Sequence, residues 1–198
     1  MTCRLRSFSA ADFVVVLIMY RKQVFMIVIE IIDIKNFMAH LLLKDTFDHF
    51  LLFEARAVTA SELLMKGGRR REWYDSDQWS QMCSERGEHD CMHMTWNEMK
   101  EIMFHFIKGK KSPQLLYVDL EASSRQREQI LGGAFAVQDS ELPSLRMQIR
   151  YENEHLTIVP AASYPSFSPD RSAGQMWEEA LQEFLRRKKI VFHLLNNS

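Results

Sequence analysis

The sequence predicts an α+β protein in which three main amphipathic helices pack on one face of a largely antiparallel sheet. Three observations lead to this fold class. Short β-branched and apolar runs recur along the chain, two segments have the pattern of β-hairpins, and three longer segments each carry one apolar stripe at helical spacing. A helix with a single apolar stripe must bury it against another element, and the face of a sheet provides that surface.

Length and composition indicate one soluble globular domain. The chain has 198 residues, of which 46% are hydrophobic and 26% are charged, and its formal net charge is −1. This near-neutral balance gives no overall attraction to nucleic acid or to an anionic membrane. The three cysteines have no framework spacing, so we expect reduced thiols and a cytoplasmic protein. Residues 26–198 are predicted to form the single domain.

Residues 1–25 are treated separately from the fold. They contain an apolar run from Phe13 to Tyr20 that follows two arginines and resembles a signal sequence. The run is short, no small-residue cleavage site follows it, and two basic residues end it, so neither a signal peptide nor a bilayer-spanning helix is predicted. We expect residues 1–25 to be a non-native or disordered extension ahead of a native start at Met26.

The first predicted elements are a strand, a helix and a second strand. Residues 26–32 are β-branched and apolar, as in a buried strand, and Asp33 is a suitable N-cap for the helix that follows. The apolar stripe of this helix consists of Ile34, Phe37, Met38, Leu41 and Leu42. Residues 50–59 are predicted to be the next strand.

A hairpin and a second helix are predicted next. Residues 61–74 have the pattern of a hairpin that turns at Gly67 and Gly68. The second helix begins near Thr95, because Thr95 and Glu98 have the spacing of a capping box. Its apolar stripe consists of Met99, Ile102, Met103, Phe106 and Ile107.

The last third of the chain completes the predicted sheet. Residues 114–123 are predicted to be a strand, followed by a short helix that ends at Gly132. Residues 144–160 have the pattern of a second hairpin, which turns around Asn153. A third long helix follows, with an apolar stripe of Trp177, Ala180, Leu181, Phe184 and Leu185. Residues 190–195 are predicted to be a terminal strand.

Three segments carry a resemblance to a known family. They are residues 31–55 (IIDIKNFMAHLLLKDTFDHFLLFEA), 106–113 (FIKGKKSP) and 176–192 (MWEEALQEFLRRKKIVF). These segments resemble an uncharacterised family of short bacterial proteins known only as a domain of unknown function. The resemblance covers most of the chain from Met26 to Phe192, without residues 83–93. It implies one small cytoplasmic domain and gives no catalytic residue.

One segment concentrates residues that bind metals. Residues 83–93, CSERGEHDCMH, hold two of the three cysteines and two of the seven histidines. Two thiolates and two imidazoles can complete a tetrahedral zinc site, so the candidate ligands are Cys83, His89, Cys91 and His93. The spacing differs from a C-x2-C knuckle, and the alternation from His89 to Met94 equally predicts a half-buried strand that leads into the second helix. The strand interpretation needs no cofactor.

Three groups of basic residues form a second candidate site, for nucleic acid or another anion. They are Lys66, Arg69, Arg70 and Arg71, then Lys108, Lys110 and Lys111, and finally Arg186, Arg187, Lys188 and Lys189. On one common face they would bind a phosphate backbone, and helices on one face of a sheet would give a clamp-like arrangement. Positive charge at the C-terminus of a helix is also favoured by the helix dipole, whatever the function.

The sequence contains no motif of a common enzyme class. It has no G-x-S-x-G, H-E-x-x-H, G-x-G-x-x-G or C-x-x-C motif. We therefore expect a binding or interaction protein of the bacterial cytoplasm rather than an enzyme, with no membrane partner. Nucleic-acid binding through the basic groups and zinc binding are the alternatives. A nucleic acid, a protein partner and a second copy of the chain all stay open as partners.

Overall fold

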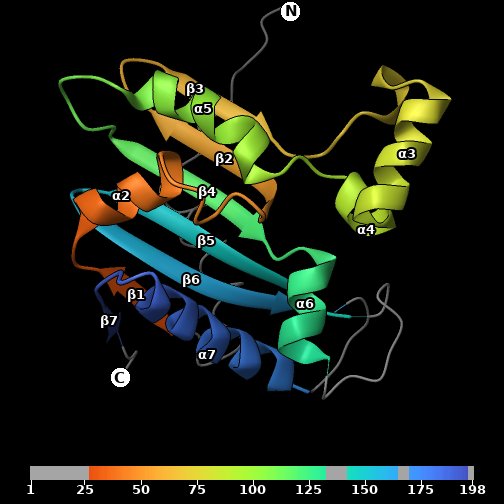
Figure 1. The fold of residues 1–198 in the computed structure, drawn as a ribbon. Helices are drawn as coiled ribbons and strands as arrows, with labels where there is room; N and C mark the ends of the chain where they lie inside the picture. The colour runs from red at the N-terminus through yellow and green to blue at the C-terminus, as the bar shows by residue number, and fades with distance from the viewer. Residues whose placement is uncertain (1–26, 133–141, 165–169, 196–198) are drawn as a thin grey trace, which may run out of the picture.

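The fold is an antiparallel sheet of seven strands with helices on one face, seen in a computed structural model that describes residues 27–132, 142–164 and 170–195 (Figure 1). The strands are β1 (Val28–Ile31), β2 (Leu51–Val58), β3 (Glu62–Lys66), β4 (Leu115–Glu121), β5 (Ser144–Glu152), β6 (His155–Ser163) and β7 (Phe192–Leu195). Their order across the sheet is β3-β2-β4-β5-β6-β1-β7, and every neighbouring pair is antiparallel. The extension expected at residues 1–25 lies outside the described residues.

The described residues form six α-helices, and four of them make a layer over the sheet. The helices are α2 (Ile34–Leu42), α3 (Ser76–Arg86), α4 (Glu88–Cys91), α5 (Trp96–Ile107), α6 (Ser124–Leu131) and α7 (Ser172–Arg187). Helix α7 packs on β5 and β6, α5 packs on β2, α2 lies beside α5, and α6 lies beside α7 (Figure 1). The predicted α+β class is therefore confirmed, with the three long predicted helices in this layer.

The core lies between the sheet and the helical layer. The sheet contributes alternate side chains, as the two-residue period of a strand requires; they include Ile29, Ile31, Ala55, Ala57, Leu116, Val118, Leu120, Leu145, Met147, Ile149 and Ile158. The stripes of α2 and α7 are buried as predicted. In α5 the prediction was wrong at Ile102, which is 52% exposed. Trp96 is fully buried instead, and its Nε1 donates to the carbonyl of Leu41 at 2.6 Å.

The capping residues of the first two long helices act as predicted. Asp33 accepts a hydrogen bond from the backbone N–H of Asn36 at 2.9 Å and caps α2. The Glu98 carboxylate accepts from the backbone N–H of Thr95 at 2.7 Å and caps α5. Each bond satisfies a backbone donor that the helix leaves without a partner.

The two hairpins differ in how well the sequence predicted them. The β5–β6 hairpin turns at Asn153 and Glu154, which have φ angles of 51° and 64° as a tight hairpin turn requires. The prediction of a hairpin that turns at Gly67 and Gly68 is wrong. Strand β3 is the second strand of a hairpin with β2, and Glu62 lies opposite Val58. The turn of this hairpin therefore lies between Val58 and Glu62.

Gly67 allows the backbone that follows β3 to approach the backbone of β2 closely. Its N–H donates to the carbonyl of Phe53 at 3.0 Å, and its carbonyl accepts from the N–H of Met94 at 2.7 Å. A Cβ atom at this position would lie 1.6 Å from the carbonyl oxygen of Leu52. The glycine therefore marks a close crossing of β2 by the chain that leaves β3.

The sheet face opposite the helices carries charged side chains, and no helix of the described part covers it. Ion pairs cross this face between neighbouring strands, including Arg56 with Glu62, Lys66 with Glu54 and Arg146 with Asp119. The Arg146 guanidinium also lies 3.6 Å from the ring centroid of Phe53. The alternation of apolar and charged residues thus separates a core face from a polar face.

Replacing Gly67 with alanine is expected to lower the free energy of unfolding by about 2–3 kcal/mol, because the backbone of Leu52 must move away from the new methyl group. The measurement is equilibrium unfolding in urea. Gly68→Ala is the matched control, since a Cβ there meets nothing within 4 Å. Equal stability of the two variants would contradict the close crossing.

Candidate functional site

Residues 69–93, called the arm here, leave the sheet after β3 and form the most distinct feature of the molecule. They comprise a short 3-10 turn (Arg71–Trp73) and the helices α3 and α4, which lie to the side of the sheet near α6 (Figure 1). Helix α3 has no buried residue. Its low apolar content explains why no apolar stripe predicted it, and the strand predicted from His89 to Met94 was wrong because residues 88–91 are helical.

Local interactions maintain the shape of the arm. Asp75 accepts from the backbone N–H of Gln78 at 2.8 Å in a capping box at the start of α3. The rings of Tyr74 and Trp79 lie 5.7 Å apart. A disulfide between Cys83 and Cys91 joins the end of α3 to α4. The arm is therefore folded by caps, ring contacts and a covalent bond rather than by a core.

Glu98 fastens the base of the arm to the helical layer. Its two carboxylate oxygens accept from the guanidinium of Arg69 at 2.7 and 2.6 Å, and one of them lies 3.3 Å from Arg86 in α3. Burial alone would raise the pKa of Glu98, but the hydrogen bonds from Arg69 and Thr95 outweigh it and lower the pKa to about 2. The Arg69 side chain is only 4% exposed, so its guanidinium is buried in this ion pair with Glu98.

A second attachment joins α4 to the start of α6. The Asp90 carboxylate accepts from the backbone N–H of Ser124 at 3.0 Å and from its hydroxyl at 2.9 Å, where the dipole of α6 favours a negative charge. His89 lies between two carboxylates, with Nδ1 3.2 Å from Asp90 and Nε2 3.3 Å from Glu121. The contacts with these two carboxylates raise the pKa of His89 to about 9, so the ring is an imidazolium at neutral pH.

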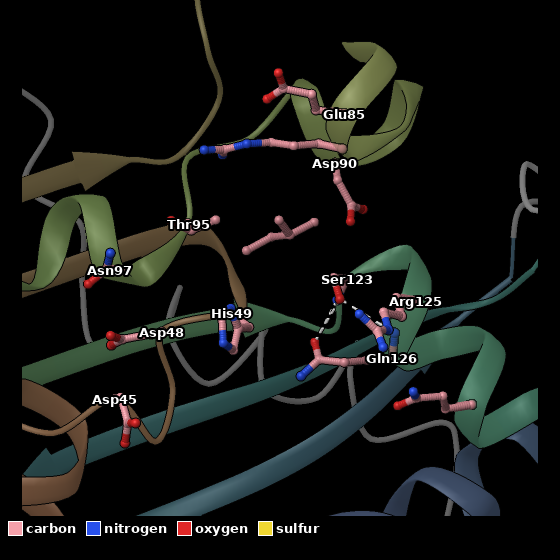
Figure 2. Close-up of a pocket in the computed structure, with 13 residues that line it drawn as sticks. Asp45, Asp48, His49, Glu85, Asp90, Thr95, Asn97, Ser123, Arg125 and Gln126 are labelled. Carbon is pink, nitrogen blue, oxygen red and sulfur yellow. Dashed lines mark hydrogen bonds between the residues drawn. The ribbon is translucent and has the colours of Figure 1, made fainter. Parts of the chain in front are cut away.

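A cleft of about 810 Å³, lined mainly by polar and charged residues, lies between the arm and the body of the protein (Figure 2). Figure 2 shows Glu85 and Asp90 on the arm, Asp45, Asp48, His49 and Asn97 on one wall, and Ser123, Arg125 and Gln126 at the start of α6. The remaining lining residues are Leu51, Arg86, Thr95 and Gln129. The cleft is thus assembled from four separate stretches of the chain.

The charged groups of the cleft differ in whether they already have a partner. Asp48 pairs with Lys100, Asp90 pairs with His89, and Arg86 pairs with Glu98. Asp45 and Arg125 are exposed, and neither side chain has an ion pair or a hydrogen bond within the described ranges. One carboxylate and one guanidinium are therefore available to a ligand.

Three of the four predicted zinc ligands, Cys83, Cys91 and His89, are engaged with other partners in this structure. Cys83 and Cys91 are bonded to each other, so the expectation of reduced thiols is corrected for this pair. His89 is held by carboxylates, and the His89 and His93 rings have their centroids 5.7 Å apart. Among the residues that the structure describes, no three histidine, cysteine, aspartate or glutamate side chains are placed to hold a metal ion.

The three basic groups lie at different places relative to the sheet. The first group follows β3 near Glu54, and its Lys66 and Arg69 already pair with glutamates. The second group precedes β4, which begins opposite Val58 at the other end of β2. The third group precedes β7, at the far edge of the sheet (Figure 1). The predicted basic residues, Lys66, Arg69, Arg70, Arg71, Lys108, Lys110, Lys111, Arg186, Arg187, Lys188 and Lys189, thus lie in three places along and across the sheet.

Sequence reasoning missed the residues that line the cleft. Asp45 follows α2, and Arg125 is the second residue of α6, so neither lies in a motif. The sequence near Arg125 does contain one local signal, which is the capping box at the start of α6. There the backbone N–H of Ser123 donates to the Gln126 side chain at 2.8 Å. That signal locates the helix start but says nothing of the arm that faces it.

The fold and the cleft define a small α+β protein with an antiparallel sheet, a helical layer and a lateral arm. Residues 40–193 match the family described as "Family of unknown function (DUF5721)", and the chain belongs to this family. This confirms the resemblance to a family of unknown function. No curated protein and no solved structure matches the chain. None of the helices in the described residues is long and apolar enough to cross a membrane.

The stability that His89 contributes is expected to depend on pH. Its pKa of about 9 in the folded protein lies above the ordinary value of 6.5, so the contribution is complete below about pH 6.5 and is lost as pH rises through 9. The difference in unfolding free energy between the wild type and His89→Gln should therefore narrow over this range. Urea unfolding at a series of pH values measures it, and a constant difference would contradict the imidazolium.

Replacing Glu98 with glutamine is expected to lower the free energy of unfolding by about 2 kcal/mol, because the buried guanidinium of Arg69 loses its charged partner. Urea unfolding measures the change. Glu101→Gln is the control on the same helix, since Glu101 is exposed and should shift stability by less than about 0.5 kcal/mol. Similar losses for both variants would rule out a special role for Glu98.

Proposed function

We propose that the protein is a non-enzymatic binding protein of the bacterial cytoplasm, and that its ligand occupies the cleft between the arm and the body. The observation that carries the proposal is a pair of charged side chains on the lining of this cleft, Asp45 and Arg125, which have neither an ion pair nor a hydrogen bond within the described residues. Asp48, Asp90 and Arg86 of the lining are engaged in ion pairs, and Glu85 accepts a hydrogen bond from Gln81 at 2.9 Å. The two that are free can form charge-assisted hydrogen bonds, which are stronger than neutral ones.

The lining favours a small, polar ligand that carries both a cationic and an anionic group. Asp45 would bind the cationic group and Arg125 the anionic group, and the amides of Asn97 and Gln126 can bond to polar groups between them. Leu51 is the apolar residue of the lining and is only 2% exposed, so polar and charged side chains decide which groups of a ligand are recognised. Free amino acids and dipeptides have this chemistry.

The same lining argues against a phosphate-rich ligand in the cleft. Asp45, Asp48, Glu85 and Asp90 place four carboxylates around it, and these repel phosphate groups. A nucleic acid would have to bind elsewhere, and the basic groups that could attract it are separated along the sheet. The zwitterionic ligand is therefore the proposal with the most support from the described residues.

Binding is tested by ligand-observed NMR with panels of amino acids and dipeptides, and with nucleotides and polyols as comparison sets. Zwitterions are expected to bind, and Arg125→Gln and Asp45→Asn should each raise the Kd about tenfold, as for the loss of one charge-assisted hydrogen bond. Arg187→Gln is the control, because this exposed arginine lies at the end of α7 and outside the cleft. Zwitterion binding that is indifferent to both cleft substitutions, or no zwitterion binding at all, would contradict the proposal.

A further inference from the structure

The arm carries a covalent bond on which the shape of the cleft depends. Cys83 lies in the second half of α3, and Cys91 is the last residue of α4. We propose that this disulfide is a redox switch: in the oxidised protein it holds α3 folded beside α4, and its reduction releases α3 and removes one wall of the cleft. The consequence for the ligand rests on the function proposed above, whereas the release of α3 does not.

Apart from its capping box and the contacts of Trp79 with Tyr74 and Arg71, all in its first half, helix α3 has little else to hold it. It spans 11 residues and buries none of them, and an isolated helix shorter than about 12–15 residues is marginal in water. Its contact with the helical layer is the ion pair between Arg86 and Glu98, in which the Arg86 side chain is 37% exposed. An exposed pair of this kind contributes little on its own. The disulfide is thus the main restraint at the end of α3.

Helix α4, in contrast, stays attached when the disulfide is broken. Cys91 is 1% exposed and follows Asp90, whose carboxylate is bonded to the start of α6. His89 in the same turn is bonded to Glu121 of β4. Reduction therefore frees one side of the bond and leaves the other in place, so the arm opens at α3.

The freed side carries part of the cleft. Glu85 and Arg86 follow Cys83 by two and three residues in α3, and both line the cleft. Figure 2 shows Glu85 on this side of the cleft. Gly87, with a φ angle of 88°, links α3 to α4, and a glycine tolerates the change of backbone angle that an opening requires. When α3 unfolds, Glu85 and Arg86 no longer line the cleft, while Asp90 keeps its position.

The exchange chemistry fits the exposure of the two sulfurs. A thiolate of a dithiol reductant attacks Sγ of Cys83, which is the more exposed partner, and Cys91 leaves as a thiolate and takes up a proton. The second thiol of the reductant then attacks the mixed disulfide and releases Cys83 as a thiol. The protein gains two electrons and two protons, and the dithiol becomes a cyclic disulfide.

The test compares oxidised and dithiol-reduced protein in a Cys3→Ser background, in which Cys83 and Cys91 are the only cysteines. Amide hydrogen exchange reports the order of each helix. Reduction is expected to abolish protection across residues 76–86 and to leave α5 and α7 protected. The Cys83→Ser variant should have the reduced pattern whether or not the dithiol is present. Equal protection of α3 in the two redox states, or free thiols at both positions after air oxidation, would overturn the switch.

The ligand readout separates this inference from the proposed function. A zwitterion that binds the oxidised protein should bind the reduced protein about tenfold more weakly, because one wall of the cleft is lost. Equal affinity in both states, with α3 released, would overturn the coupling and leave the proposed function standing. A redox-dependent α3 in a protein that binds no zwitterion would support the switch and overturn the proposed function.

Discussion

The carboxylate of Glu98 joins three parts of the molecule that are distant along the chain. It caps α5, it holds the guanidinium of Arg69 at the base of the arm, and it lies next to Arg86 in α3. The arm has no core of its own, so its position relative to the body depends on this carboxylate and on the attachment of Asp90 to α6. These attachments place the arm beside the helical layer, and the cleft lies between the arm and the body.

The elements that local pattern predicts are those whose burial follows from one stretch of sequence. Helices α2, α5 and α7 have apolar stripes that can be read directly, and their positions agree with the prediction. Gly67 was misread because its reason is a contact with Leu52, which lies on another strand. Helix α3 was missed because a helix that buries nothing has no stripe to detect. Pattern therefore predicts packing against the core and is silent on segments that fold by local bonds.

The candidate sites were harder to predict than the fold. Clustering in sequence suggested a metal site at residues 83–93, but its cysteines bond to each other and His89 bonds to carboxylates. The basic groups are clustered in sequence and dispersed in space, because they follow elements that end at different places in the sheet. The cleft shows the opposite case, since Asp45 and Arg125 are 80 positions apart in the sequence and line one cleft only after folding.

The most direct test of the central claim is to locate the bound ligand on the protein by amide chemical-shift mapping. Addition of a saturating zwitterion is predicted to shift the amides of Asp45, Asn97, Ser123 and Arg125, which surround the cleft on separate elements. The amides of the polar sheet face, such as Tyr117 and Arg150, should stay unchanged. Shifts confined to that sheet face, with the cleft unperturbed, would contradict the account.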